Sequence, residues 1–380
     1  MKEVRLLATA MLLVACRHAA DPAPLPLLGE DAATYWPAAE WRRTSPALVG
    51  IDEDRISRLV AQLRSNAIRG VDELVIVRRG YLVVDETFNQ WHQDSIHTMQ
   101  SVTKSVTSLV AGIAIARGDF ASVDQRVLDL FPDYVPVANL DDRKRALTVR
   151  DLLTMRTGLD WSESVYEGSP LQQLNRSTTD WLRFVIDWPM RELPGTRWEY
   201  NSGGVILLGG AMGLRGGMNT ADYARQYLLR PIGIVGDKWV RGFPDLLPHT
   251  GGGLYLTTRD LSRIGYLVLR GGRWAEAQIV SADWIAESTR PVVAAPRTFN
   301  GRPTDYGYLW WLMPLDGVPG HTRTRDETVI AGIGAMGQWL FVVPRHDLVV
   351  AVTSRIVGGN EAAPLEFFYS EILPATRPIP

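Results

Sequence analysis

The order in which apolar patterns follow one another limits this chain to few folds. Its β-patterned segments form two groups, one near each end of the chain: 73–78 and 81–86, then 307–312, 337–343 and 347–353. The Arg79-Gly80 pair between the first two is typical of a tight hairpin turn. The middle, about residues 120–250, carries helical patterns and Pro-rich turns. We therefore expect an α+β fold in which both chain ends build one antiparallel sheet, with an all-helical subdomain inserted between them and helices flanking the sheet.

Helical periodicity is present in several segments. They are 52–69, 101–117, 150–155, 219–230, 258–270, a segment beginning at Asp283, and 364–372. Segment 101–117 is apolar on most sides, which is typical of a helix buried within the protein. Gly118 follows it directly and is the expected C-cap.

The N-terminus has the pattern of a processing segment. Two basic residues precede an apolar run over 6–15, which is too short to span a bilayer. The run ends in Leu13-Val14-Ala15-Cys16, which resembles the lipobox of bacterial lipoproteins. We expect residues 1–16 to be a lipoprotein-type signal and a lipid on Cys16 to be the only membrane attachment. An ordinary secretion signal is the alternative, and both predict an extracytoplasmic protein, on the periplasmic side.

Composition narrows the partners and the chemistry. The formal net charge of −2 offers no basic excess to neutralise phosphates, so we expect no nucleic-acid partner. The six His are not at metal-ligand spacings, and the chain has neither a G-x-x-x-x-G-K-[ST] loop nor a G-x-S-x-G elbow. We therefore expect no metal, no nucleotide and no α/β-hydrolase fold. Residues 17–50, rich in Ala and Pro, are expected to form a tether and an irregular lead-in.

A Ser–Lys pair at helical spacing is the first candidate for chemistry. The chain has four lysines against 36 arginines, and Lys104 stands three residues after Ser101. Residues i and i+3 share a helix face, with Cβ atoms about 5–6 Å apart, so the hydroxyl is within reach of the amine. A desolvated Lys, unlike Arg, can lose its proton and act as a base. This is the S-x-x-K arrangement of penicillin-binding proteins and serine β-lactamases. A solvated Lys near a polar helix start is the alternative.

Tyr200 is the second candidate. It lies in the segment Trp198-Glu199-Tyr200-Asn201-Ser202. A Tyr close to an ammonium group can share a proton with it, so Tyr200 could relay the Ser101 proton to a leaving group. A core Tyr with one hydrogen bond is the alternative.

Several segments together resemble the class C β-lactamase-like serine hydrolases, which include penicillin-binding proteins, D-aminopeptidases, β-lactamase-fold esterases and 6-aminohexanoate-dimer hydrolases. These segments are 101–104, 150–159, 194–204, 252–261, 306–311 and 334–338. The resemblance covers about residues 50–370. It implies a β-lactamase/transpeptidase-like domain over 51–375. It also implies a serine hydrolase that cleaves small-molecule or peptide esters or amides through an acyl-enzyme, without a cofactor.

The resemblance also implies residue roles. Ser101 would be the nucleophile, Lys104 its base partner and Tyr200 the second proton-transfer group. One oxyanion-hole N–H would come from Ser101 at the helix N-terminus. The other would come from the segment Gly334-Ala335-Met336-Gly337, with Ala335 or Met336 as the donor.

Two departures from the family pattern bear on the substrate. Asn201 and Ser202, expected to bind substrate, follow Tyr200, so the second motif is Tyr-x-Ser, as in the family's amide and ester hydrolases, rather than Tyr-x-Asn. The Lys-Thr-Gly motif, whose Lys would bind the β-lactam carboxylate, is absent from the late strand. This disfavours an efficient β-lactamase. The segment His249-Thr250-Gly251 imitates the motif but precedes a helix, so we expect a loop there.

Three readings of the function remain open. The first is an esterase or amidase, and the second is a D-peptidase or penicillin-binding enzyme acting on cell-wall peptides. The second would need a carboxylate-binding Arg, for which Arg323 and Arg325 are candidates. The third is a sensor or cell-wall binding protein without turnover. The candidates to line the cleft are Trp198, Trp310, Trp311 and Trp339.

Overall fold

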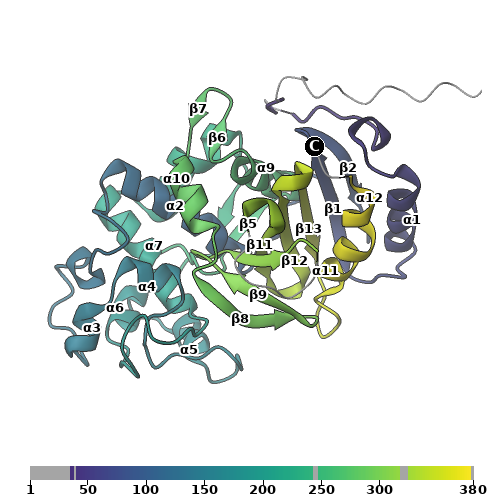
Figure 1. Ribbon diagram of the computed structural model, residues 1–380. Coiled ribbons are helices and arrows are strands. Elements are labelled where there is room, and N and C mark those ends of the chain that lie inside the picture. The colour runs from purple at the N-terminus through teal and green to yellow at the C-terminus, as the bar shows by residue number, and fades with distance from the viewer. Residues whose placement is uncertain (1–34, 38–39, 243–246, 317–323, 378–380) are drawn as a thin grey trace, which may run out of the picture.

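The computed structural model describes residues 35–37, 40–242, 247–316 and 324–377 (Figure 1). The expected signal segment, with Cys16, lies outside the described residues. None of the helices in the described ranges has the length and apolar character needed to cross a bilayer.

An eight-stranded antiparallel sheet forms the centre of the fold, in the order β2-β1-β13-β12-β11-β10-β9-β8 (Figure 1). The strands are β1 (Val71–Arg78), β2 (Tyr81–Thr87), β8 (Val293–Phe299), β9 (Arg302–Tyr306), β10 (Trp311–Pro314), β11 (Thr328–Gly334), β12 (Gln338–Val343) and β13 (Leu348–Ser354). Strand β1 pairs with β13, with Val75 opposite Ala351, so the two ends of the chain meet inside the sheet, one strand in from its β2 edge. The predicted α+β fold with a sheet built from both chain ends is confirmed.

Helices flank the sheet and gather beside it. They are α1 (Glu53–Arg64), α2 (Val102–Arg117), α3 (Asp142–Ala146), α4 (Val149–Leu153), α5 (Pro170–Arg176), α6 (Trp181–Ile186), α7 (Ser202–Gly216), α8 (Thr220–Ala224), α9 (Thr258–Leu269), α10 (Ala282–Ser288), α11 (Ala363–Phe367) and α12 (Leu373–Ala375). Helix α9 packs on β1, β12 and β13. Helices α3 to α7 lie together at one side of the sheet (Figure 1).

Helix α2 joins the sheet to these helices. Every residue from Val102 to Ala114 is buried, because the helix packs against α7 on one side and against β11 and β12 on another. Gly118 ends it in the left-handed conformation, at φ 81°. The predicted buried helix and its C-cap are confirmed, and Ser101 is its N-cap.

The sequence prediction was partly wrong for the strands of the C-terminal half. The predicted strand 307–312 begins only at Trp311, because the residues before it bond to helical segments: Tyr308 N–H donates to the Ser288 carbonyl and Leu309 N–H to the Leu153 carbonyl. Leu309 has φ 62°, which breaks an extended strand. Strands β8, β9 and β11 were not predicted. The first helix ends at Arg64 rather than 69.

Candidate active site

The first turn of α2 brings Ser101 and Lys104 together. Lys104 Nζ donates to Ser101 Oγ at 3.1 Å, and the Lys104 side chain is buried at 2% exposure. Ser101 is the N-cap, yet its hydroxyl makes no capping hydrogen bond and remains available for chemistry. Gln100, directly before it, has φ 45°, a conformation that non-glycine residues adopt at a cost of about 1–3 kcal/mol.

A glycine loop completes the surroundings of Lys104. Its Nζ also donates to the Gly251 carbonyl at 2.5 Å. The loop approaches so closely that a Cβ on Gly251 would lie 3.1 Å from the Ser202 Cβ. Burial and the charge of Lys104 lower the pKa of the neighbouring His249 to about 4, so this imidazole is neutral at pH 7. The segment 249–251 is a loop, as expected, but it reaches the site, which the sequence analysis missed. Three consecutive glycines, 251–253, were the available signal of close approach.

Tyr200 faces Lys104 through its ring. Lys104 Nζ lies 4.6 Å from the centre of the Tyr200 ring, a cation–π distance. The ring also stacks on Trp311, with centres 6.3 Å apart and planes at 18°. Tyr200 therefore lies beside the Ser–Lys pair, held by aromatic packing.

The two residues after Tyr200 have structural partners. Asn201 is the N-cap of α7: its side chain accepts from Gly204 N–H at 2.8 Å and donates to Thr157 Oγ1 at 3.1 Å. Ser202 donates to the Glu163 carboxylate through its backbone N–H at 2.5 Å and its hydroxyl at 2.8 Å. Neither residue is among those described as lining the cleft, whereas Glu163 is. Glu163 had no sequence signal, because it reaches Ser202 from a loop 39 residues away.

Ser101 opens into a cleft of about 330 Å³. Its lining is Ser101, Glu163, Tyr200, Arg297, Phe299, Trp311, Ile333, Gly334, Ala335, Trp339, Glu361 and Ala362. The aromatic members touch one another, with Phe299 edge-on to Trp311 at 5.1 Å between ring centres. The Arg297 guanidinium lies 5.0 Å from the centre of the Tyr200 ring. The cleft is thus an aromatic slot with two carboxylates and one guanidinium.

The turn between β11 and β12 forms another wall of the cleft. Ala335 lines it, whereas Met336 and Gly337 are not among the lining residues. Met336 has φ 61° and its N–H donates to the Glu361 carboxylate at 2.9 Å. The structure thus places the candidate hairpin beside Ser101, with one of its N–H groups already bonded.

The Beta-lactamase family model matches residues 56–370, most of the chain. The chain belongs to the Beta-lactamase family. The resemblance to class C β-lactamase-like serine hydrolases is thereby confirmed, as is the β-lactamase/transpeptidase-like fold.

Individual relatives are distant. The chain is 24% identical over 328 residues to the 6-aminohexanoate-dimer hydrolase of Paenarthrobacter ureafaciens, covering 82% of this chain and 79% of that one. It is 24% identical over 307 residues to penicillin-binding protein 4 of Amycolatopsis lactamdurans, covering 74% and 77%. Among solved structures, the hydrolase EstCE1, described as having promiscuous acyltransferase activity, superposes with a TM-score of 0.68 at 17% identity over 85% of this chain and 98% of that one. The family is that of serine hydrolases acting on esters and amides.

Within this family fold, Arg325, one of the two predicted carboxylate-binding arginines, lies away from the cleft. Arg325 donates to Thr289 Oγ1 at 3.1 Å and to the Val268 carbonyl at 2.7 Å, so it holds helices together and does not line the cleft. Arg323 lies outside the described residues. Arg297, which the sequence analysis missed, lines the cleft from β8, a strand it did not predict.

Of the four tryptophans predicted to line the cleft, two do so and two do not. Trp311 and Trp339 line the cleft. Trp198 packs edge-on against Trp311 at 5.9 Å, and Trp310 is fully buried core.

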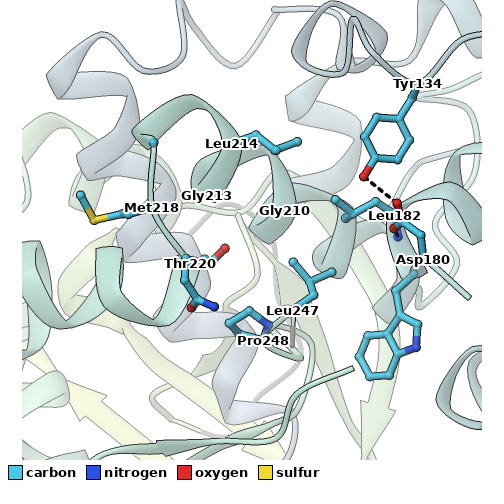
Figure 2. A pocket seen from close by; sticks show the side chains of 13 residues that line it. Tyr134, Asp180, Leu182, Gly210, Gly213, Leu214, Met218, Thr220, Leu247 and Pro248 are labelled. Carbon is cyan, nitrogen blue, oxygen red and sulfur yellow. Dashed lines mark hydrogen bonds between the residues drawn. The ribbon is translucent and has the colours of Figure 1, made fainter. Parts of the chain in front are cut away.

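A second cavity of the described structure lies among the helices of this family member. It measures about 390 Å³ and is lined mainly by α6, α7 and the residues that follow α7. Figure 2 shows the hydrogen bond between Tyr134 and Asp180 at one end of it. Ser101, Lys104 and Tyr200 do not line it. No group of three or more His, Cys, Asp or Glu within the described ranges is arranged to hold a metal ion. The smaller cleft is therefore the candidate active site.

Proposed function

We propose that the protein hydrolyses a small-molecule or peptide ester or amide through an acyl-enzyme on Ser101. The observation that carries this proposal is the 3.1 Å contact between Ser101 Oγ and the buried Lys104 Nζ beside a cleft. A Ser hydroxyl is a weak nucleophile until an adjacent base takes its proton.

In the proposed reaction, Ser101 Oγ attacks the substrate carbonyl carbon and gives its proton to the Lys104–Tyr200 pair. That proton then passes to the leaving alcohol or amine as its bond to the carbonyl carbon breaks. Water next attacks the acyl-enzyme, gives one proton to the same pair, and releases the acid. The proton returns to Ser101 Oγ, so the enzyme is regenerated. The contact between Lys104 Nζ and the Tyr200 ring places the two side chains next to each other beside Ser101.

Two backbone N–H groups would hold the tetrahedral oxyanion. Ser101 supplies one at the N-terminus of the 16-residue helix α2, where the helix dipole favours negative charge. We assign the other to Ala335, because Met336 N–H is occupied by Glu361 and Ala335 lines the cleft. Removing one such donor costs about 10²–10³ in kcat in a known serine protease.

A second candidate function is a D-peptidase or penicillin-binding enzyme. The observation that favours it is Arg297, whose guanidinium could take a substrate carboxylate inside the cleft. A sensor that acylates but does not turn over would use the same residues.

The test uses residues 17–380 and the Ser101→Ala variant, each with p-nitrophenyl butyrate and with benzylpenicillin. We expect the wild type to turn over the ester, with a mass increase on Ser101, and the variant to do neither. Steady penicillin acylation without ester turnover would favour the second candidate. Identical behaviour of wild type and variant with both compounds would contradict the nucleophile assignment.

The membrane anchor is a separate proposal that rests on the lipobox-like ending at Cys16. We expect the full chain expressed in bacteria to fractionate with membranes and the Cys16→Ser variant to leave them. Membrane association that survives this substitution would contradict a lipid anchor on Cys16.

A further inference from the structure

We propose that Glu361 is a positioning residue that holds the oxyanion hairpin, residues 334–338, in its working conformation. The inference rests on the proposed function, since it concerns the donor assigned to Ala335. Glu361 comes from the loop between β13 and α11 and reaches the hairpin through one carboxylate oxygen, which accepts Met336 N–H at 2.9 Å.

The hairpin needs such support because of its backbone. Met336 lies at φ 61° and ψ 19°, and Gly337 at φ 84°. The left-handed region is disfavoured for a residue with a side chain, so it persists only where surrounding contacts over-determine it. The Met336 carbonyl accepts from Ile356 N–H at 3.1 Å and from Gln338 Nε2 at 3.3 Å. With Glu361 on its N–H, the residue is held at both ends.

The backbone of Glu361 is itself held by hydrogen bonds. Glu361 N–H donates to the Gly359 carbonyl at 3.1 Å, and its own carbonyl accepts Trp339 Nε1 at 3.2 Å. The loop is therefore tied to a residue of the cleft wall. Glu361 thus couples the wall of the cleft to the turn between β11 and β12.

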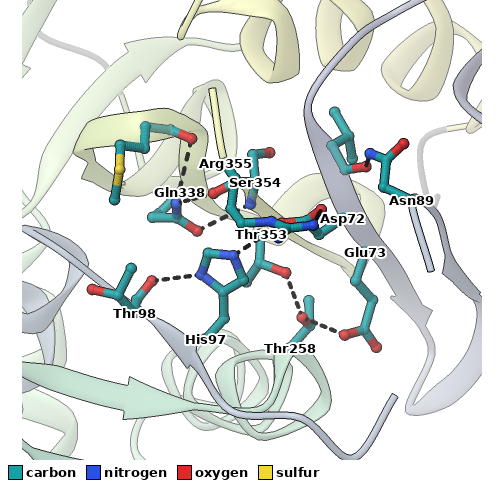
Figure 3. A network of polar contacts seen from close by, with 12 residues as sticks. Asp72, Glu73, Asn89, His97, Thr98, Thr258, Gln338, Thr353, Ser354 and Arg355 are labelled. Carbon is teal, nitrogen blue, oxygen red and sulfur yellow. Dashed lines mark hydrogen bonds and ion pairs between the residues drawn. The ribbon is translucent and has the colours of Figure 1, made fainter. Parts of the chain in front are cut away.

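On the opposite side, the hairpin is clamped to β13. Gln338 Nε2 donates to the Ser354 carbonyl at 2.6 Å, and Ser354 N–H donates back to Gln338 Oε1 at 3.1 Å. Figure 3 shows Gln338 beside Ser354, with Arg355 and Asp72 close by in the same polar network. This clamp fixes the start of β12 but leaves the Met336 N–H to Glu361 alone among the described residues.

The consequence for catalysis is geometric. If Glu361 let go, the peptide group between Ala335 and Met336 could rotate out of the left-handed turn. The neighbouring Ala335 N–H would then lose its direction toward the carbonyl oxygen of a substrate on Ser101. Glu361 also brings a negative charge to the cleft, which cannot favour an oxyanion. Its benefit must therefore come from the hydrogen bond, and Gln, a neutral acceptor of the same length, should replace it.

The experiment compares Glu361→Ala, Glu361→Gln and the control Glu371→Ala. Glu371 bonds to Arg55 at 3.2 Å and does not line the cleft. For Glu361→Ala we expect kcat to fall about 10- to 100-fold, of the order known for the loss of an oxyanion donor, with KM within about twofold. Its affinity for phenylboronic acid, whose Ser adduct places an oxygen in the oxyanion hole, should fall in proportion. Amide hydrogen exchange over 334–338 should rise about tenfold or more. Glu361→Gln and Glu371→Ala should stay near wild type in all four measurements.

Unchanged exchange over 334–338 in Glu361→Ala would overturn the proposal, whatever the activity. A Glu361→Gln variant that loses as much kcat as Glu361→Ala would also overturn it, because charge and not the hydrogen bond would then be responsible. If the wild-type protein hydrolyses no ester and does not acylate, the proposed function fails, whereas the exchange measurement still decides the role of Glu361 in the hairpin.

Discussion

Two lysines of this protein are equally buried and do different things. Lys104 and Lys144 are each 2% exposed. Lys144 Nζ donates to three backbone carbonyls, those of Ala138, Ile186 and Trp188, at 2.7–3.0 Å. Lys104 Nζ donates to one carbonyl and to a hydroxyl that opens into a cleft, and it lies over an aromatic ring.

The difference shows that burial alone does not mark a reactive lysine. Lys144 satisfies its three donors with fixed acceptors, which makes it a structural clamp between segments 42 and 44 residues apart. Burial lowers the pKa of Lys144, and the three groups that its Nζ contacts are carbonyl oxygens, which have no proton to give. Lys104 has instead a partner that can lose a proton and a path to a substrate. The partner, and access to the cleft, distinguish the two.

The largest effect is expected when each lysine is replaced separately by Met, which keeps most of the aliphatic stem. We expect Lys104→Met to lower kcat for p-nitrophenyl butyrate by about 10³ or more, because the nucleophile loses its base. We expect Lys144→Met to lower the free energy of unfolding by about 2–4 kcal/mol, because buried carbonyls lose their donor. Activity per folded molecule of Lys144→Met should stay within twofold. Activity assays and urea unfolding would measure this, and equal activity losses in the two variants would erase the distinction.

Removing one hydroxyl tests whether Tyr200 belongs with Lys104. Tyr200→Phe keeps the ring contacts with Lys104 and Trp311 but cannot carry a proton, so kcat should fall about 10²-fold, in the range of general acid–base catalysis. Tyr223→Phe is the control, since the Tyr223 hydroxyl donates to Asp119 outside the cleft. It should lose stability and keep kcat. Full activity in Tyr200→Phe would leave Lys104 as the sole proton carrier.

Glu73 is a third buried ionisable group, and it should affect stability alone. Burial raises its pKa to about 8, while Thr258 Oγ1 donates to one carboxylate oxygen at 2.7 Å. The folded state therefore keeps a proton that the unfolded state has lost above its ordinary value of 4.5, and stability falls as pH rises toward 8. Between pH 6.5 and 8 the loss should be up to about 1.4 kcal/mol per pH unit. This window avoids the opposite contribution of His249, whose lowered pKa of about 4 makes stability fall as pH drops from 6.5 to 4.

Glu73→Gln should flatten the stability profile between pH 6.5 and 8 and leave kcat unchanged. Urea unfolding at several pH values would measure this. An equally steep profile in the variant would assign the slope to another group.

The smallest expected effect is a change in KM that distinguishes Arg297 from Arg325. Arg297→Ala should raise KM about fivefold for an ester that carries a carboxylate, through loss of a charge-assisted contact, and should leave a neutral ester unaffected. Arg325→Ala should lower the unfolding temperature and change neither KM, because its partners are Thr289 and the Val268 carbonyl. A rise in KM for the neutral ester with Arg297→Ala would point to packing against Tyr200 instead of charge.

The sequence predicted those features of the site that depend on residues close together in the chain. The helix period alone was enough to bring Ser101 to Lys104, because residues three positions apart on a helix lie on the same face. Tyr200 was likewise predicted from a short segment, residues 194–204, that resembles the family. By contrast, Arg297 could not be found, since it lies on a strand whose own pattern is weak and whose place at the sheet edge depends on pairing with β9.

The sequence by itself determined the family and the sheet built from both chain ends, because these follow from the order of motifs and strand patterns. It also determined the buried helix α2 and the Ser–Lys pair, because these follow from spacing along a few residues. Only the tertiary structure decided what surrounds that pair. The Gly251 carbonyl reaches Lys104 across 147 residues, Glu163 reaches Ser202 across 39, and Glu361 reaches Met336 across 25. Such contacts are set by how helices and strands pack, and packing joins residues that no periodicity connects.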